Sequence, residues 1–520
     1  MTRILLACLL VLSAALPARA QDAFTAALPG LFGGFNDIAT SVDQLGSAGD
    51  PRALPLLRAL ADGRLLKRET TLIIRADAGA TDAVTGAAAD AAGAEAVRLN
   101  NRVRVALRGA IGRLALVSPD AAERASAAEA VFRSRSAENI PILEAALARE
   151  SVPRIRAQME LSLAASRLIA SDAAVQRQGI AALAAAGTEG ARALLLEARN
   201  STPALAEEIT AALVALDRTL AIKRAAETLY QGLSLGSVLL LAALGLAVTF
   251  GVMGVINMAH GEFVMLGAYA TVVVQDLCKD IPWLQPWSLP LAVPAAFIVA
   301  GLAGALLERG LIRHLYGRPL ETLLMTFGVG MILQQAVRLA FGAQNREVIS
   351  PAWMQGTLEL PFGLMVTQNR LWVIVFSLVV LGLTIAAIRY TRFGLEMRAV
   401  TQNRRIAATM GIRTGRVDAL TFAFGSGIAG MAGVALSQID NVSPNLGTGY
   451  IIDSFMVVVF GGVGSLAGTL VGALSLGVVN KLLEPWAGAV LAKVAVLVGL
   501  MLFIQRRPRG LFPQKGRAAS

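Results

Sequence analysis

Cysteine and histidine are scarce in this chain, which limits the chemistry that it can perform. The 520 residues include two cysteines, Cys8 and Cys278, and two histidines, His260 and His314. Because Cys8 lies in a leader segment described below, the mature chain has no cysteine pair for an intrachain disulfide and no cysteine-based zinc site. Neither H-E-x-x-H nor G-x-x-x-x-G-K-[ST] occurs, so metalloprotease and ATP-binding motifs are missing. We therefore expect a non-catalytic chain that needs no metal and no cofactor.

Charged residues are also few, and apolar residues are abundant. Only 16% of the residues are charged, 55% are hydrophobic, and the mean hydropathy is +0.61. These values predict a membrane protein, since soluble domains are less apolar. The formal net charge of +11 invites a nucleic-acid interpretation, but after residue 300 the arginines lie mostly in short segments between apolar blocks. Cytoplasmic loops of membrane proteins have this composition, so we expect no nucleic-acid partner.

Residues 1–20, MTRILLACLLVLSAALPARA, have the layout of a secretory signal peptide. A basic residue, Arg3, is followed by a short apolar stretch and then by Ala18 and Ala20 in A-x-A spacing. The alternative is an uncleaved anchor, but the apolar stretch is short for a membrane span. We predict cleavage after Ala20, which leaves the following residues outside the cytoplasm.

Residues 21–225 form a region of different composition, rich in alanine and arginine and without a run long enough to cross a bilayer. The segments 48–60, 136–148 and 186–198 each show a turn followed by an amphipathic helix. This pattern is compatible with HEAT-like repeats and equally with an irregular helical bundle. Residues 76–96 lack large apolar anchors, and we expect a flexible excursion there. The whole region is predicted to be an exported α-helical domain.

Residues 226–510 are predicted to form a transmembrane domain, and 511–520 a cytoplasmic tail. The apolar blocks cover residues 230–252, 253–275, 287–307, 320–341, 371–389, 418–439, 452–480 and 487–504. Each approaches or exceeds the ~20 residues that a membrane-spanning helix needs. If the first domain lies outside, the arginine-rich segments after the third and fifth blocks fall inside, as the positive-inside rule requires.

Eight simple crossings would leave the basic tail outside the cell. One block after residue 418 must therefore re-enter or cross twice, and the candidate is 452–480, which GGVGS interrupts at 461–465. The predicted fold class is all-α, with a polytopic helical membrane protein of about 8–9 spans, some interrupted, after a soluble helical domain.

Two groups of residues within the apolar blocks are candidates for a functional site. They are Asn257, His260, Gly261 and Glu262 in the second block, and Gly461, Gly462, Gly464 and Ser465 in the seventh. An ionisable residue at membrane depth usually faces a cavity, a partner or the interior of the bundle. Paired interrupted helices are typical of transporter binding sites, because broken helix ends offer free N–H and C=O groups. We predict that both groups line a translocation path. The alternative is that His260 and Glu262 bond each other or cap a helix without meeting a solute.

Four segments together resemble one known family. They are residues 232–269, 392–434, 459–477 and 507–517. These segments resemble the inner-membrane permeases of branched-chain amino-acid type ABC importers, which carry a sequence similar to INMAHGE at 256–262. Those amino-acid permeases start almost directly at the first span, whereas an exported helical domain is similar to the extension of the urea-importer branch. The resemblance therefore implies a urea permease, with branched-chain or other amino acids or amides as the alternative substrates.

The resemblance also implies partners, a location and a coupling element. A permease of this kind lies in the lipid of the bacterial inner membrane and works with two ATP-binding subunits, a second permease subunit and a periplasmic binding protein. The loop after the fifth block would dock on the ATP-binding subunits through a short helix. The residues concerned are Arg398, Ala399, Asn403, Ala407 and Gly411. This loop and the C-terminus would be cytoplasmic and the N-terminal domain periplasmic. A solvated positive-inside loop accounts for the arginines equally well.

The sequence leaves the substrate and two other classes of protein open. Urea is neutral and needs amide, carbonyl and hydroxyl groups such as those of Asn257 and Ser465, whereas the carboxylate of Glu262 suits the ammonium group of an amino acid. A membrane-anchored sensor would need few spans and no interrupted helices. A passive urea channel would need no docking helix.

Overall fold

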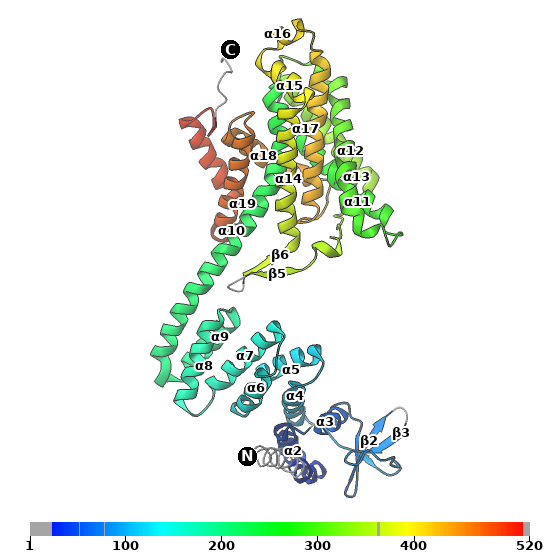
Figure 1. Ribbon diagram of the computed structural model, residues 1–520, viewed down its shortest axis with the longest axis vertical. Helices are drawn as coiled ribbons and strands as arrows, with labels where there is room; N and C mark the ends of the chain where they lie inside the picture. Colours follow the sequence, from blue (N-terminus) through cyan, green and yellow to red (C-terminus); the bar gives the residue numbers. More distant parts are fainter. Residues whose placement is uncertain (1–22, 51, 77–78, 361–363, 513–520) are drawn as a thin grey trace, which may run out of the picture. The chain divides into compact units, whose positions relative to one another are not determined.

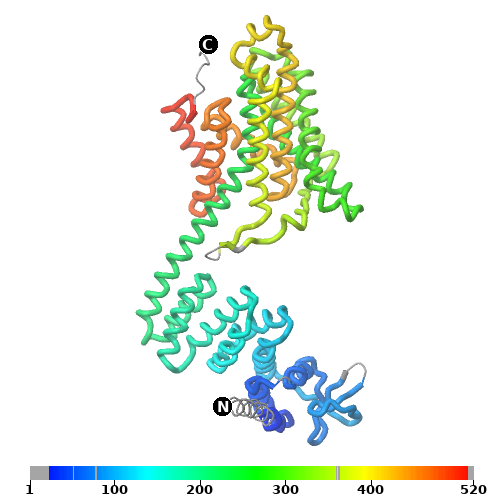
Figure 2. Tube along the Cα trace, in the orientation of Figure 1, coloured from blue at the N-terminus to red at the C-terminus, as the bar shows by residue number. Residues whose placement is uncertain are grey.

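The computed structural model describes residues 23–50, 52–76, 79–360 and 364–512. The predicted signal peptide 1–20 and most of the predicted tail, 513–520, lie outside the described residues. The chain divides into two compact units, residues 1–221 and residues 222–520. Most of the described chain is helical, and the second unit holds several membrane-length helices, as Figures 1 and 2 show. The predicted class, a polytopic helical membrane protein with a helical N-terminal region, is confirmed.

The first unit is built from short helices that pack on their neighbours in the sequence. The helices are α2 (Phe35–Ala48), α3 (Ala53–Ala61), α4 (Asn101–Ala115), α5 (Ala121–Ser134), α6 (Ile140–Leu147), α7 (Pro153–Leu168), α8 (Ala173–Ala186) and α9 (Glu189–Ser201). Polar side chains cap several of their first turns: the Asn100 side chain accepts a hydrogen bond from the Val103 N–H at 2.9 Å, and Asp120 does the same for Ala122. Pairwise contacts link α4 to α5, α5 to α7, and α7 to α8. Each helix therefore packs mainly on helices that lie close to it in the sequence.

A small sheet interrupts these helices, and it corrects the prediction of a flexible excursion at 76–96. Strands β1 (Leu65–Arg68), β2 (Thr71–Ala76), β3 (Gly79–Asp82) and β4 (Glu95–Ala96) pair antiparallel in the order β3-β2-β1-β4. The segment has few apolar side chains of its own, but its backbone pairs with β1 and β2, whose side chains at Leu65 and Ile73 are buried. Asp82 adds a turn, because its carboxylate accepts the Thr85 N–H at 2.7 Å, which lowers the pKa of Asp82.

The second unit contains the membrane-length helices, the first of which begins in the first unit and continues into the second. They are α10 (Ala206–Met253), α11 (His260–Cys278), α12 (Ser288–Gly310), α13 (Pro319–Phe341), α14 (Gln368–Tyr390), α17 (Thr414–Leu436) and α19 (Leu466–Arg506), seven among the described residues. The apolar windows of α10, α11 and α17 are mostly buried, whereas only 17–33% of the windows of α12, α13, α14 and α19 is buried. Three central helices are therefore surrounded by helices with apolar outer faces, the arrangement expected in lipid. A hairpin, β5 (Thr357–Leu360) and β6 (Leu364–Thr367), precedes α14.

Shorter helices complete the unit. α15 (Arg392–Gln402) and α16 (Arg404–Thr409) follow α14, and α18 (Leu446–Gly461) precedes α19. The predicted block 452–480 is therefore two helices joined by the turn at 462–465. α19 is itself broken at Gly488, which has φ +76°.

The contacts of α19 show that its two halves run in opposite directions. Its first half lies along α10 in the antiparallel sense, because Gly464 meets Gly251 and Val478 meets Gly232. After Gly488 the chain returns, and the Leu511 N–H donates to the carbonyl oxygen of Phe460 at 2.9 Å. The C-terminal segment thus ends beside the turn at which α19 began.

Candidate functional site

The start of α11 lies beside α10 about three turns before that helix ends. α10 finishes at Met253, residues 254–259 are not helical, and Gly254 takes φ +67°. The Nε2 atom of His260 donates to the carbonyl oxygen of Ala242 at 2.9 Å. Ala242 lies eleven residues before Met253, which corresponds to about 17 Å along an α-helix. The segment 254–259 therefore turns back along α10, and α11 begins inside the helix bundle.

His260 and Asn257 anchor this turn-back segment in the protein interior. Both are almost fully buried, and the Asn257 Oδ1 atom accepts the Ala259 N–H at 3.0 Å. The Met258 N–H donates to Thr326 Oγ1 on α13 at 3.1 Å. His260 therefore bonds to α10 and not to Glu262, which excludes one of the two structural alternatives. Asn257 Nδ2 and His260 Nδ1 have no hydrogen-bond partner among the described residues.

A second interrupted segment meets the first one at the start of α18. α17 ends at Leu436, residues 437–445 are mostly non-helical, and α18 follows. A Cβ added to Gly447 would lie 2.1 Å from the carbonyl oxygen of Gly261, and one added to Gly261 would lie 2.4 Å from that of Gly447. Only glycine permits this approach of two backbones. The first turns of α11 and α18, each with N–H groups that have no partner within the helix, therefore lie side by side.

Five polar residues gather around these two helix starts, and we refer to them as the Glu262 cluster. The cluster comprises Glu262 on α11, Gln334 and Arg338 on α13, Asn445 before α18, and Thr448 on α18. Thr448 Oγ1 donates to Glu262 Oε1 at 3.5 Å. Asn445 Oδ1 accepts from Gln334 Nε2 at 2.8 Å and from Arg338 Nη2 at 3.0 Å. Glu262 Oε2 and Arg338 Nε have no partner among the described residues. The cluster therefore offers one carboxylate, one guanidinium and three neutral polar groups with spare hydrogen-bonding capacity.

α13 presents a stripe of residues to both interrupted segments. Thr326, Gly330, Gln334 and Arg338 recur every fourth residue and so share one face of the helix. Thr326 bonds to the first interrupted segment, and a Cβ added to Gly330 would lie 3.4 Å from the Cγ atom of Glu262. Sequence reasoning missed this stripe, because the α13 block was assigned only as an apolar span. The fourfold spacing was the available signal.

The predicted second group does not join the first, which corrects the expected pairing. Gly464 lies against Gly251 on α10, nine residues beyond Ala242, a separation of about 14 Å along that helix. Gly462 lies against Phe512 of the C-terminal segment, and Gly461 packs on α19. Ser465 caps α19 by accepting the Gly468 N–H at 3.1 Å. These residues form the turn between α18 and α19. The start of α11 instead meets the start of α18, which follows the interruption at 437–445 that the predicted block 418–439 cut across.

The predicted coupling helix is two helices instead of one. Asn403 separates α15 from α16, and its side chain accepts the Ile406 N–H at 3.0 Å as an N-cap. Ala407 is buried with Val248 of α10 in a small apolar cluster. Of the predicted residues not yet placed, Arg398 is exposed and Ala399 is half-buried on α15. Figure 1 shows both helices beside the first turns of α17.

The tip of α16 is apolar and exposed. The Ile406 and Met410 side chains are 60% and 79% exposed. Gly411, with φ +87°, then turns the chain toward α17. This tip is therefore a compact apolar projection bounded by an N-cap and a left-handed glycine.

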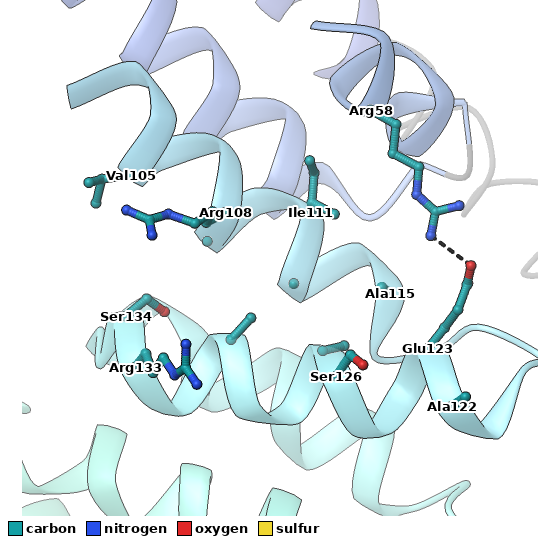
Figure 3. A pocket seen from close by; sticks show the side chains of 14 residues that line it. Arg58, Val105, Arg108, Ile111, Ala115, Ala122, Glu123, Ser126, Arg133 and Ser134 are labelled. Atoms are coloured by element: carbon teal, nitrogen blue, oxygen red, sulfur yellow. Dashed lines mark hydrogen bonds and ion pairs between the residues drawn. The ribbon is translucent and has the colours of Figure 1, made fainter. Parts of the chain in front are cut away.

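The first unit contains a groove between α4 and α5 with a volume of about 600 Å³. Figure 3 shows the side chains that line it, including Arg58, Arg108 and Arg133. Arg58 Nη2 donates to Glu123 Oε1 at 2.9 Å, and Arg108 has no ion-pair partner among the described residues. The floor consists of small residues such as Gly112. A groove with guanidinium groups at its rim suits acidic groups.

In the described part of the chain, no three His, Cys, Asp or Glu side chains lie close enough together to hold a metal ion.

One short motif resembles that of an enzyme. The residues Gly232–Gly236, GLSLG, match the G-x-S-x-G pattern of hydrolases. They lie inside α10, without the strand-to-helix turn that exposes a nucleophilic serine, and both glycines pack against α19.

Comparisons with known proteins agree on one family. Residues 228–505 match the family described as branched-chain amino acid transport system / permease component. The high-affinity branched-chain amino acid transport system permease protein LivH of Salmonella typhimurium is 33% identical over 295 residues, which cover 55% of this chain and 94% of LivH. The corresponding permease protein BraD of Pseudomonas aeruginosa is 30% identical over 296 residues, with the same coverage of each chain. The ribose import permease protein RbsC of Escherichia coli is 30% identical over 101 residues, 18% of this chain and 32% of RbsC. No solved structure matches.

Proposed function

Because this chain belongs to the family of branched-chain amino acid transport system permease components, we propose that it is the permease subunit of an ATP-driven importer for amino acids. The observation that carries the proposal is the Glu262 cluster at the meeting point of α11 and α18. The chain itself would supply the path for the solute and perform no chemistry. The inner membrane of a bacterium is the location that fits such an importer.

The charges of the Glu262 cluster support an amino acid as the solute. An amino acid carries an ammonium group and a carboxylate, which need an acceptor and donors respectively. Glu262 has one carboxylate oxygen without a partner among the described residues, and Arg338 Nε is also without one. The first turns of α11 and α18 add N–H groups that favour a carboxylate. Urea is neutral and would leave both the carboxylate and the guanidinium without a charged partner.

Urea remains the competing substrate. The family match covers residues 228–505, so the N-terminal domain lies outside it, and the unmatched 6% of LivH is too short to hold such a domain. A domain of this kind is the feature by which the chain resembles the urea-importer branch. The substrate test below therefore includes both solutes.

Uptake of labelled leucine and labelled urea distinguishes these two substrates. We would compare cells that lack this gene with cells that carry the parent chain, Glu262→Gln or the control Glu321→Gln. Glu321 lies in the first turn of α13, is exposed and pairs with Arg318. Loss of a hydrogen bond to a charged group is worth about 1.5–3 kcal/mol, so Glu262→Gln should raise the KM for leucine by roughly tenfold to a hundredfold. Glu321→Gln should leave it unchanged.

The uptake results decide between the two solutes directly. Leucine uptake that depends on ATP, is competed by leucine alone and responds to Glu262→Gln supports the proposal. Urea uptake that urea alone competes, with no response to Glu262→Gln, replaces it with a urea importer of the same family. Flux of either solute that persists without ATP replaces it with a passive channel.

The partners proposed for the importer follow from two surfaces. The apolar tip of α16, Ile406 with Met410, would dock on the ATP-binding subunits, of which we expect two. A second permease subunit would cover part of the exposed apolar surface of α13. We expect a periplasmic binding protein to deliver the solute and the N-terminal domain to lie on the same side of the membrane. ATP-driven closure at α16 would then open the path near Glu262 to the cytoplasm.

A further inference from the structure

A buried ion pair fastens α16 to α17. Arg404, the first residue of α16, donates from Nη1 to Asp418 Oδ1 at 3.2 Å and from Nη2 to Oδ2. The Asp418 side chain is fully buried, whereas that of Arg404 is 44% exposed. A carboxylate without water needs a partner of opposite charge, and the fork of a guanidinium meets both of its oxygens. Two bonds from one guanidinium to both oxygens of Asp418 therefore constrain the position of the first residue of α16 as well as its distance from α17.

A tyrosine and a second buried acid extend the ion pair to α12 and α13. The guanidinium carbon of Arg404 lies 4.7 Å from the centre of the Tyr316 ring, which stands between α12 and α13. The Tyr316 hydroxyl donates to Glu308 Oε1 on α12 at 3.2 Å, and Glu308 is 2% exposed. Glu308 has no ion-pair partner among the described residues. We call these four residues, Arg404, Asp418, Tyr316 and Glu308, the Arg404 joint.

The rest of α16 is held less rigidly than the joint. The helix has six residues, with the N-cap at Asn403 before it and the left-handed Gly411 after it. Ala407 is its one buried residue. A short helix between two turns can rotate as a unit, and its motion then reaches the spans through the side chains that grip them.

The two elements that the joint reaches lead directly to the Glu262 cluster. α17 continues from Asp418 to Gly433, which packs against Val264 of α11, and then to the interrupted segment before α18. α13 begins shortly after Tyr316 and carries the polar stripe. The joint is thus the contact from which α17 and α13 diverge toward the two sides of the cluster.

We propose that the Arg404 joint is the positioning element that transmits movement of α16 to α17 and α13, and so to the Glu262 cluster. This inference rests on the proposed function, since it assumes that α16 receives movement from ATP-binding subunits. It does not depend on whether the solute is an amino acid or urea. Arg404 and Tyr316 act through the helices they hold and touch no solute.

The test uses the full chain assembled with its ATP-binding subunits in proteoliposomes, whose closed lumen allows uptake to be measured. Gly449 on α18 is exposed, with nothing within 4 Å of an added Cβ, and adjoins Thr448 of the cluster. A reporter chain carrying Gly449→Cys and Cys278→Ser would then have its new thiol beside the cluster. The rate at which a water-soluble thiol reagent labels this cysteine, measured with and without ATP, would report opening of the cluster. Cys278 is the one free cysteine in the described part of the chain.

Three variants would be compared in this reporter chain. Tyr316→Phe removes the hydroxyl that reaches Glu308 and keeps the ring and its packing. Arg404→Lys keeps the charge but loses the fork that holds both oxygens of Asp418. The control is Arg416→Lys, because Arg416 is exposed in the first turn of α17 and has no ion-pair partner among the described residues. Solute uptake per ATP hydrolysed is measured beside the labelling.

We expect the ATP-binding subunits to co-purify with all three variants. In Tyr316→Phe and Arg404→Lys, both the ATP-dependent change in labelling and the uptake per ATP should fall. For Arg404→Lys the fall should be about tenfold, which is the size of change that loss of a coupling contact produces. Arg416→Lys should match the reporter chain.

Two results would overturn the inference. One is an ATP-dependent change in labelling that both joint variants retain in full. The other is loss of the ATP-binding subunits or of membrane-inserted chain in both, which would make the joint a folding contact only. Labelling that does not respond to ATP in the reporter chain itself contradicts the proposed importer, so the two failures are distinguishable.

Discussion

Replacing Gly447 by alanine tests whether α11 and α18 meet through their backbones. A Cβ at Gly447 would lie 2.1 Å from the carbonyl oxygen of Gly261, 2.4 Å from its carbonyl carbon and 3.0 Å from the Glu262 N–H nitrogen. All three are backbone atoms, so no change of side-chain rotamer relieves the overlap. One of the two helix starts must move away from the other.

The expected size of the effect combines two opposing contributions. Forcing an extra carbon into a closely packed region costs about 1–3 kcal/mol in the free energy of unfolding. Alanine instead of glycine within a helix recovers roughly 0.5–1 kcal/mol. Because the overlap is with backbone atoms, the packing cost lies at the upper end of its range, and we expect Gly447→Ala to destabilise the chain by about 2 kcal/mol. Gly449→Ala, two residues along the same helix and with nothing within 4 Å, should be neutral or slightly stabilising.

The assay is the fraction of detergent-solubilised chain that stays monodisperse after heating, measured by size-exclusion chromatography for both variants. Solute uptake by cells is measured in parallel. Gly447→Ala should lower the midpoint of the heating curve by a few degrees and reduce uptake more than expression. Equal midpoints and equal uptake for the two variants would refute the backbone contact, and with it the position of the Glu262 cluster.

Three further predictions concern the coupling loop, the N-terminal domain and the topology. Gly411→Val should abolish ATP-driven uptake while the chain still inserts into membranes, because a β-branched residue is strained at φ +87°; uptake and membrane content check this. The Arg124 guanidinium, whose Nε lies 2.6 Å from Glu150 Oε2, holds the pKa of Glu150 below its ordinary value of 4.5. Glu150 therefore stabilises the folded domain above that pH and loses this effect as the pH falls below it, so Glu150→Gln should flatten the acid side of a proteolysis-resistance profile. An impermeant thiol reagent should label Ser126→Cys in intact spheroplasts and Thr409→Cys only after permeabilisation.

Each of these predictions has a matched control or a contrary result. Gly415→Val has open space around it and should keep uptake; equal loss in both valine variants would remove the special role of Gly411. An unchanged acid profile in Glu150→Gln would contradict a stabilising Glu150–Arg124 pair. Labelling of Thr409→Cys before that of Ser126→Cys would reverse the proposed orientation.

The membrane character of the chain and its interrupted spans could be predicted from sequence, because they depend on local properties. The length of an apolar run decides whether a helix can cross a bilayer, and a glycine-rich break such as 461–465 is visible within the run itself. The charge pattern predicted an additional pass after residue 418, and the structure places two helices, α18 and the broken α19, in that region. The family resemblance also came from contiguous segments, and residues 228–505 match that family.

The predictions that failed were those in which pairing across the chain decides the outcome. Residues 76–96 have few apolar side chains, so composition alone indicated disorder. Their backbone pairs with strands β1 and β2, whose own apolar side chains are buried. The break at 461–465 was assigned to the site because glycines marked it. The residue that does meet Gly261 is Gly447 at the start of α18, and the polar loop 437–445 that precedes it carries no such mark in the sequence.

The sequence by itself determined that this is a polytopic helical permease with a helical N-terminal domain and a buried Asn257–Glu262 segment, since hydrophobic length and family motifs are properties of continuous stretches. Only the tertiary structure decided which groups surround Glu262. Thr448 is 186 residues away in the chain, and the stripe of α13 is defined only once the helix packs against both interrupted segments. The physical reason is that a binding site is a set of contacts among distant residues, and a local pattern specifies which residues are available for it but not which of them meet.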